Sequence, residues 1–186
     1  KLNVKENWPI NCLFWIKELF HIYKSKYLET IALNNVSVQF NRGQFYAIMG
    51  PSGSGKSSFL KILGGLLVPT TGRIYFKPDD KNSEIINIAT YSLKERTKYR
   101  RDYVGYVFQD YNLFEYLTVE ENIQIPLLIK GKNVEENEEQ ILSIMNACGI
   151  ENRREYNIDQ LSGGEKQRVQ IAMAMVSNPK IILADE

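Results

Sequence analysis

A glycine-rich loop at residues 50–57, with the sequence GPSGSGKS, is the feature that most constrains how this chain can fold. It fits the pattern G-x-x-x-x-G-K-[ST], in which a buried strand leads into the loop and a helix leads out of it. The flanking residues match that context: the apolar run at 44–49 predicts a buried parallel strand, and Lys56–Leu63 has a helical pattern. The core is therefore expected to contain a strand–loop–helix unit.

The residue types in this phosphate loop suit an anion. Gly50, Gly53 and Gly55 allow backbone angles that other residues resist, so successive N–H groups can point inward. The following helix adds its unpaired N–H groups and the positive end of its dipole. Lys56 can reach the β- and γ-phosphates of a nucleotide, and the Ser57 hydroxyl can ligate Mg²⁺. The candidate nucleotide-binding residues are Gly50, Pro51, Ser52, Gly53, Ser54, Gly55, Lys56, Ser57 and Ser58.

A second motif, Leu161-Ser162-Gly163-Gly164-Glu165, opens another helix and is called the LSGGE turn below. Ser162 and Glu165 have the spacing of a capping box. A core stripe follows at helical spacing, formed by Val169, Ala172, Met173 and Val176. Capping does not explain two glycines in the first turn, where each costs up to about 1 kcal/mol of helix propensity. They make sense if this turn lies flat against a phosphate.

An acidic pair ends the chain. The helix before it stops at Asn178-Pro179, and residues 180–184 then read as a buried strand that leads to Asp185 and Glu186. Taken alone this pair is weak evidence, since a strand can simply end in solvent. In a chain with a phosphate loop, Asp185 would hold Mg²⁺, and Glu186 could polarise a water for attack on the γ-phosphate.

Composition narrows the class of protein. The 186 residues suggest one domain and at most part of a second, with a core that needs no disulfides. A net charge of +1 gives no case for a nucleic-acid surface. Cys12 and Cys148 lie far apart without metal-ligand spacing, which favours two unpaired thiols. No run approaches the ~18 apolar residues of a membrane-spanning helix or resembles a signal peptide.

Strand and helix patterns alternate along the chain, which predicts an α/β sheet with a helical insertion. Residues 1–12 read as a tail, and residues 77–90 as polar and irregular. The other expected strands are 13–16, 31–40, 73–76 and 104–108, and the other expected helices are 92–101, 118–130, 134–148 and 165–177.

Four segments in order, GPSGSGKSS, VFQD, LSGGEKQR and IILADE, resemble the nucleotide-binding domain of ABC transporters. The resemblance covers about residues 13–186 and implies a P-loop NTPase parallel sheet with an antiparallel β subdomain. It also implies an inserted helical subdomain at about residues 112–162. In the family two such domains close head to tail, so ATP would lie between the phosphate loop of one and the LSGGE turn of the other, at Ser162, Gly163 and Gly164.

The resemblance assigns further roles. Gln109 in VFQD matches a glutamine that contacts Mg²⁺ and the attacking water. The implied metal ligands are Ser57, Gln109 and Asp185, and the implied catalytic residues are Glu186, Lys56 and Gln109. An aromatic residue upstream of the phosphate loop stacks on adenine in the family. Tyr23 is the best match by position, and Tyr27 is the alternative.

The resemblance also implies partners: a transmembrane permease domain or subunit, a second cassette, and a place at the cytoplasmic face of a bacterial membrane. LADE at the last strand, with VGYVFQDYNLFEYLTVEENI, is similar to the bacterial group that extracts lipoproteins or exports macrolides and antimicrobial peptides, and to its cell-division relative. Amino-acid importers share much of this pattern, so an importer ATPase stays open as an alternative.

Two other classes compete. A non-transport ABC ATPase of DNA repair would separate the two motifs by a long coiled coil, whereas residues 56 and 162 are joined by a compact insertion without heptads. A translation-type ABC protein would carry two cassettes, and this alternative stays open. A plain P-loop kinase is disfavoured by the LSGGE turn.

Some family features differ or are missing. Met173 stands where the family usually has Arg, so an interface contact can be lost. The family continues with a PTGNLD-like loop, further strands and a switch histidine, and the one histidine here, His21, lies elsewhere. We therefore expect a C-terminally incomplete domain that turns over ATP poorly by itself and has an exposed sheet edge.

Overall fold

The computed structural model describes residues 8–79 and 83–185, so Glu186 lies outside the described residues. The chain forms two compact units, residues 1–97 and 98–186. Helix α2 (Leu93–Tyr103) contributes its first turn to one unit and its remainder to the other. Within the described residues, none of the helices has the length and apolar character needed to cross a bilayer.

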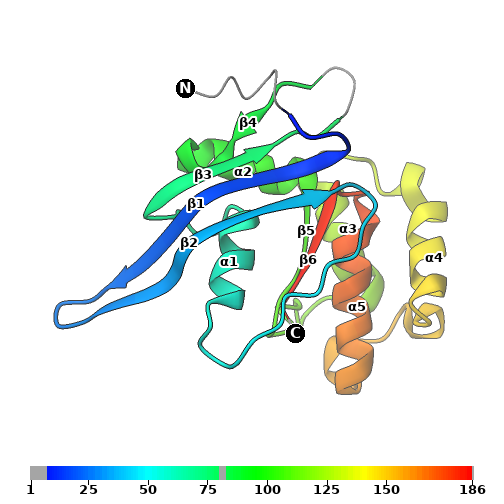
Figure 1. Ribbon diagram of the computed structural model, residues 1–186. Helices are drawn as coiled ribbons and strands as arrows, with labels where there is room; N and C mark the ends of the chain where they lie inside the picture. The colour runs from blue at the N-terminus through cyan, green and yellow to red at the C-terminus, as the bar shows by residue number, and fades with distance from the viewer. Residues whose placement is uncertain (1–7, 80–82, 186) are drawn as a thin grey trace. The chain divides into compact units, whose positions relative to one another are not determined.

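An antiparallel sheet of four strands, in the order β2-β1-β3-β4, forms the first unit. Figure 1 shows β1 lying between β2 and β3, with α1 beside β2. The strands are β1 (Cys12–Lys24), β2 (Glu29–Asn41), β3 (Thr71–Phe76) and β4 (Ile86–Asn87), and the short helix η1 is Ile88–Thr90. Rings of Phe14 and Phe76 pack in its core with centroids 4.8 Å apart. β4 and η1 occupy part of the segment expected to be irregular.

Strand β1 is longer than the expected strand at 13–16. Its alternation is broken by a bulge between Ile16 and Leu19, where Glu18 has a φ of 50°. The strand resumes after the bulge and continues to Lys24, which simple alternation could not reveal. Its first residue, Cys12, is fully buried, and burial raises the pKa of the Cys12 thiol to about 11. Neither Cys12 nor Cys148 forms a disulfide, as expected.

The strand expected at residues 44–49 is a wrong prediction. The backbone there forms no strand, and the side chains of Phe45 and Met49 are 94% and 88% exposed. The ladders of the first unit pair β1 with β2 and β3, and β3 with β4; none includes this segment. A strand requires a neighbour that supplies hydrogen-bonding partners, and an apolar run by itself cannot provide one.

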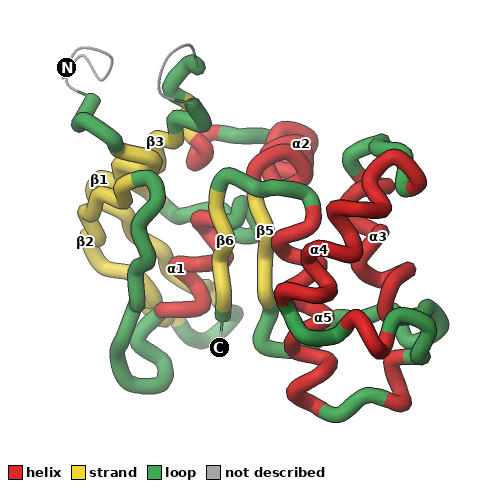
Figure 2. Tube along the Cα trace, turned by 90° about the vertical axis from the view of Figure 1, so that its right-hand side faces the viewer, coloured by secondary structure: helices red, strands yellow, loops and turns green. Residues whose placement is uncertain are grey.

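The second unit contains a two-stranded parallel sheet, β5 (Val104–Val107) beside β6 (Ile181–Ala184). Figure 2 shows this pair and the helices that accompany it. The helices are α3 (Val119–Ile129), α4 (Glu138–Ala147) and α5 (Gly163–Val176), with short helices η2 (Glu135–Asn137), η3 (Glu151–Arg153) and η4 (Ile158–Gln160). Parallel and antiparallel sheets in one chain confirm the expected α/β class.

One apolar cluster holds the three helices together. Its members come from α3, α4, α5 and the connections between them: Val119, Ile123, Leu127, Ile141, Met145, Ile150, Ile158, Leu161, Val169, Ala172 and Val176. Met173 is partly buried against this cluster, in agreement with its place in the core stripe. Helix α5 also lies very close to β5, because a Cβ on Gly105 would be only 2.1 Å from the carbonyl oxygen of Ala174.

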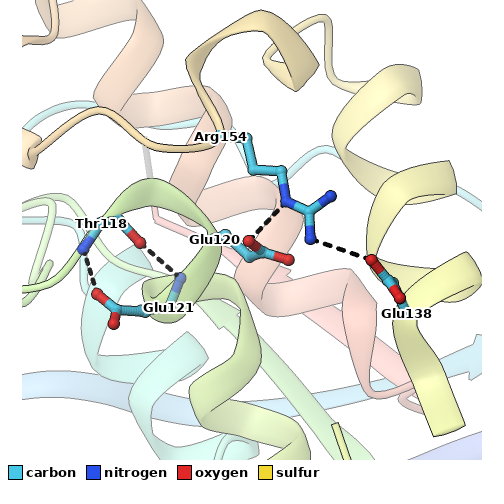
Figure 3. A network of polar contacts seen from close by, with 5 residues as sticks. All are labelled: Thr118, Glu120, Glu121, Glu138 and Arg154. Atoms are coloured by element: carbon cyan, nitrogen blue, oxygen red, sulfur yellow. Dashed lines mark hydrogen bonds and ion pairs between the residues drawn. The ribbon is translucent and has the colours of Figure 1, made fainter. Parts of the chain in front are cut away.

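Polar contacts around the start of α3 are shown in Figure 3. The Thr118 hydroxyl accepts from the Glu121 amide at 3.2 Å, and the Glu121 carboxylate accepts from the Thr118 amide at 2.7 Å. Arg154 Nε donates to Glu120 at 2.6 Å, and its NH2 group donates to Glu138 at 3.1 Å. These carboxylates raise the pKa of the Arg154 guanidinium. Arg154 thereby links the first turns of α3 and α4.

The apolar cluster predicts a sharp contrast between two adjacent leucines of α3. Leu127 is fully buried, whereas Leu128 is 56% exposed. We expect Leu127→Ala to lower the free energy of unfolding by about 2–5 kcal/mol, because it leaves a cavity. The matched control Leu128→Ala should change it by less than about 0.5 kcal/mol. Urea denaturation followed by circular dichroism measures both, and equal effects would contradict the helix packing described above.

Candidate phosphate-binding site

The phosphate loop connects residues 44–49 to helix α1 (Lys56–Leu63), whose bounds are those expected. Gly53 and Gly55 have φ values of 77° and 90°, in the left-handed region, as the sequence predicts. Gly50 does not, which corrects that expectation. At Gly50 the constraint is space, since a Cβ there would be 2.8 Å from Ser54 Oγ. The backbone turn therefore depends on the two later glycines.

Gly55 also brings the start of α1 against the sheet. A Cβ at this position would be 2.2 Å from the carbonyl oxygen of Ala32 in β2, so no larger residue fits without moving the backbone. One turn further on, the ring of Phe59 packs on Phe40 of β2, with centroids 6.2 Å apart. The N-terminus of α1, with its unpaired N–H groups, is thus fixed at the edge of the loop.

Lys56 folds back over the phosphate loop. Its Nζ donates hydrogen bonds to the carbonyl oxygens of Gly50 and Pro51, at 2.9 and 3.0 Å. Residues 51–54 are exposed around it. Among the described residues, the hydrogen-bond partners of the Lys56 ammonium are these two neutral carbonyls. Beside the positive end of a helix, this ammonium can form stronger charge-assisted hydrogen bonds to an anion. The loop therefore has the chemistry of a phosphate-binding site.

The structure distinguishes the two aromatic candidates upstream of the loop. Tyr23, near the end of β1, forms a hydrogen bond between its hydroxyl and Ser58 Oγ at 3.0 Å, and its side chain is 45% exposed. Tyr27 lies in the turn between β1 and β2, is 87% exposed, and has the Lys26 ammonium 5.5 Å from its ring centroid. Of these two candidates, Tyr23 is therefore the one in contact with the phosphate-loop region.

The LSGGE turn forms the capping box that the sequence predicts. Glu165 accepts from the amide and the hydroxyl of Ser162, both at 2.8 Å, while Gly163 and Gly164 stay exposed in the first turn of α5. Arg153 Nε donates to the other Glu165 oxygen at 2.8 Å. Hydrogen bonds from Arg153 and Ser162 lower the pKa of Glu165 to about 2.

The segment after Gln109 lies against the LSGGE turn. Gln170 in α5 donates to the carbonyl oxygen of Asp110 at 3.0 Å, and a Cβ on Gly163 would be 3.0 Å from the Tyr111 hydroxyl. Sequence patterns did not identify Arg153, Tyr111 or Gln170, because these contacts join residues that are distant along the chain. No local spacing signals them.

Gln109 and Asp185 follow the carboxyl ends of neighbouring parallel strands. Val107 of β5 pairs with Ala184 of β6, and the Asp185 amide donates to the Val107 carbonyl at 2.9 Å. Asp185 is 8% exposed, and burial together with the Asp185 charge raises the pKa of Tyr106. Ligands bind at such carboxyl ends in open α/β sheets. Glu186, the next residue, is outside the described residues.

Known proteins are similar to this chain in sequence and fold. A family model described as ABC transporter matches residues 33–186. This chain belongs to the ABC transporter family. The family makes it an ATP-binding cassette ATPase, which confirms the resemblance, the fold class and the ATPase activity inferred from the sequence.

The relatives agree with this assignment. The uncharacterized ABC transporter ATP-binding protein MJ0796 of Methanocaldococcus jannaschii is 42% identical over 177 residues, covering 92% of this chain and 72% of the relative. The ABC transporter ATP-binding protein YtrE of Bacillus subtilis is 37% identical over 163 residues, covering 88% of this chain and 68% of the relative.

Solved structures of the MJ0796 cassette are also similar. A dimeric structure described as a bacterial ABC transporter cassette has a TM-score of 0.83 and 39% identity, covering 94% of this chain and 74% of that chain. A second dimeric structure, of a post-hydrolysis state bound to ADP and Pi, has a TM-score of 0.82. These findings support ATP as the nucleotide and a second cassette as a partner of the family.

The bonds at Glu165 predict a specific pH dependence. Because its pKa in the folded chain is lowered to about 2 from 4.5, the carboxylate stabilises the fold above pH 4.5, and this contribution is lost as the pH falls toward 2. We expect Glu165→Gln to be less stable than wild type near neutral pH, with the difference disappearing toward about pH 2. Urea midpoints across this range provide the measurement.

Glu155→Gln is the matched control, since Glu155 is an exposed residue of the connection between α4 and α5 that also contains Arg153. It should follow the wild-type stability at every pH. A Glu165→Gln deficit of the same size at low and neutral pH would show that the carboxylate charge is not what stabilises the turn.

Proposed function

We propose that the chain binds ATP at the phosphate loop and hydrolyses it to drive a membrane transporter. The observation that carries this proposal is the loop itself, where Lys56, the first residue of α1, folds back to donate to the carbonyls of Gly50 and Pro51, its hydrogen-bond partners among the described residues. The proposed nucleotide-binding residues are Gly50, Pro51, Ser52, Gly53, Ser54, Gly55, Lys56, Ser57, Ser58 and Tyr23. Tyr23 stacks on the base, supported by its contact with Ser58.

The donor set proposed for Mg²⁺ consists of Ser57, Gln109 and Asp185. Mg²⁺ in nucleotide-binding proteins takes one or two carboxylates together with phosphate oxygens and waters, so Asp185 is a sufficient carboxylate. Asp185 follows the carboxyl end of β6, the edge at which ligands bind in open α/β sheets. When bound, Mg²⁺ would neutralise charge that develops on the phosphate oxygens.

Three residues have proposed catalytic roles. Glu186 accepts a proton from, or polarises, the attacking water, which requires a carboxylate without a metal partner. Gln109 orients that water through its amide. Lys56 neutralises the β- and γ-phosphate oxygens with charge-assisted hydrogen bonds.

The LSGGE turn is proposed to face the ATP of a second cassette in a head-to-tail dimer. Ser162, Gly163 and Gly164 are exposed at the N-terminus of α5, where unpaired N–H groups favour an anion. The hydrogen bond from Arg153 to Glu165 stabilises the conformation of this turn. The dimeric relatives described above support a partner of this kind.

The membrane partner is proposed to be a transmembrane permease domain or subunit, with the cassette peripheral at the cytoplasmic face of a bacterial membrane. Residues 13–186 would form the ATPase domain after a tail at 1–12, with a helical subdomain at about 112–162. The stretch after Gln109 would face the permease. The substrate would be a peptide, lipoprotein or drug-like molecule that is exported or extracted.

The alternatives are an amino-acid importer ATPase and a non-transport ABC ATPase. Co-purification with a membrane protein would separate the non-transport ATPase from the exporter and the importer.

Nucleotide affinity tests the phosphate loop directly. We expect Lys56→Ala to weaken ATP binding by at least about tenfold, because charge-assisted hydrogen bonds contribute about 1.5–3 kcal/mol. Lys61→Ala, an exposed position on the same helix, is the matched control and should bind ATP as wild type does. Isothermal titration calorimetry measures both. Equal affinities of the Lys56 and Lys61 variants would refute the assignment of the loop.

Hydrolysis tests Glu186. Measured in the completed domain, the Glu186→Gln variant should bind ATP with unchanged affinity but release phosphate at least about a hundredfold more slowly, since general-base catalysis contributes about 10²–10⁴-fold. It should also accumulate as an ATP-bound dimer in size-exclusion chromatography. A variant with wild-type phosphate release would show that Glu186 is not the base.

A further inference from the structure

His21 is a buried aromatic residue of the first unit that the proposed function does not use. It lies in β1 where the pairing with β2 is irregular on both sides, its side chain is 6% exposed, and neither ring nitrogen has a hydrogen-bond partner among the described residues. Burial lowers the pKa of His21, an effect that the backbone of Val68 partly opposes. A buried imidazole of this kind packs mainly as a flat ring against a neighbouring side chain.

The neighbour is Tyr23. The rings of His21 and Tyr23 lie against each other although the pairing of β1 with β2 is irregular between His21 and Ile22. Their ring centroids are 4.6 Å apart and the planes are at 89°, which is the favourable edge-to-face arrangement of an aromatic pair. This contact restricts how the tyrosine ring can turn about its side-chain bonds.

The far end of the Tyr23 ring is held as well. Its hydroxyl shares a 3.0 Å hydrogen bond with Ser58 Oγ in α1. The ring is therefore fixed at one end by its own strand and at the other by the helix of the phosphate loop. Because 45% of the side chain is still exposed, the fixed ring leaves a surface on which a flat ligand can stack.

We propose that His21 is a positioning residue for the nucleotide base: it holds the Tyr23 ring in the orientation that stacks on a purine. This inference rests on the proposed role of Tyr23 and extends it to a residue that does not itself touch the nucleotide. A ring that is already ordered loses less side-chain freedom when a base binds, so affinity for the base increases. Affinity for the phosphates is independent of it.

The test compares two probes on the full chain, ATP and inorganic tripolyphosphate, which has the phosphates without the base. His21→Ala should weaken ATP binding about two- to tenfold, the range that an aromatic pair contributes, and leave tripolyphosphate binding unchanged. His21→Phe keeps the ring and should restore ATP affinity. In the background of Tyr23→Ala, His21→Ala should have no further effect, because His21 acts through the tyrosine.

Each outcome is decisive. Equal losses for ATP and tripolyphosphate in His21→Ala, or no rescue by His21→Phe, would overturn the positioning role and leave the base-stacking role of Tyr23 intact. A Tyr23→Ala variant with wild-type ATP affinity would overturn the base-stacking role itself, and this inference with it. If His21→Ala does not fold, His21→Leu fills the same space without an aromatic ring, and wild-type ATP affinity in that variant would refute the proposal.

Discussion

The close approach of Gly55 to the backbone of β2 is the constraint on which the phosphate-binding unit depends. Only a residue without a Cβ allows α1 to begin against the carbonyl of Ala32. That placement fixes the unpaired N–H groups of the helix, the reach of Lys56 and the position of Ser58. Through Ser58 it also fixes Tyr23. A single steric requirement therefore sets the geometry of both the phosphate-binding and the base-stacking candidates.

In the second unit, the exposed first turn of α5 is ordered by hydrogen bonds and not by a close backbone contact. The first turn of α5 contains two glycines, whose conformational freedom would allow it to fray. The carboxylate of Glu165 counteracts this by bonding Ser162 on one side and Arg153 on the other. The turn can then stay both exposed and ordered, as a surface that binds an anion must be. Gln170 and Tyr111 bring the segment after Gln109 to the same place.

Much of the fold followed from local patterns. The bounds of α1 were as expected, and α5 began at its capping residue, because glycines, caps and helical periodicity act within a few residues. The sequence patterns gave wrong strands where strand formation depends on pairing with a neighbouring strand. Residues 44–49 are apolar enough for a buried strand but form none, and β1 continues past a bulge that breaks its alternation.

The sequence alone determined the family and the residue types of the site, since GPSGSGKS and LSGGE place glycines, hydroxyls and charges at fixed spacing. The tertiary structure decided which of two tyrosines meets the phosphate-loop region, that Arg153 bonds Glu165 and that His21 packs on Tyr23. Those answers depend on contacts between residues far apart in the chain. The energy of such contacts comes from packing and hydrogen bonds that no local pattern encodes.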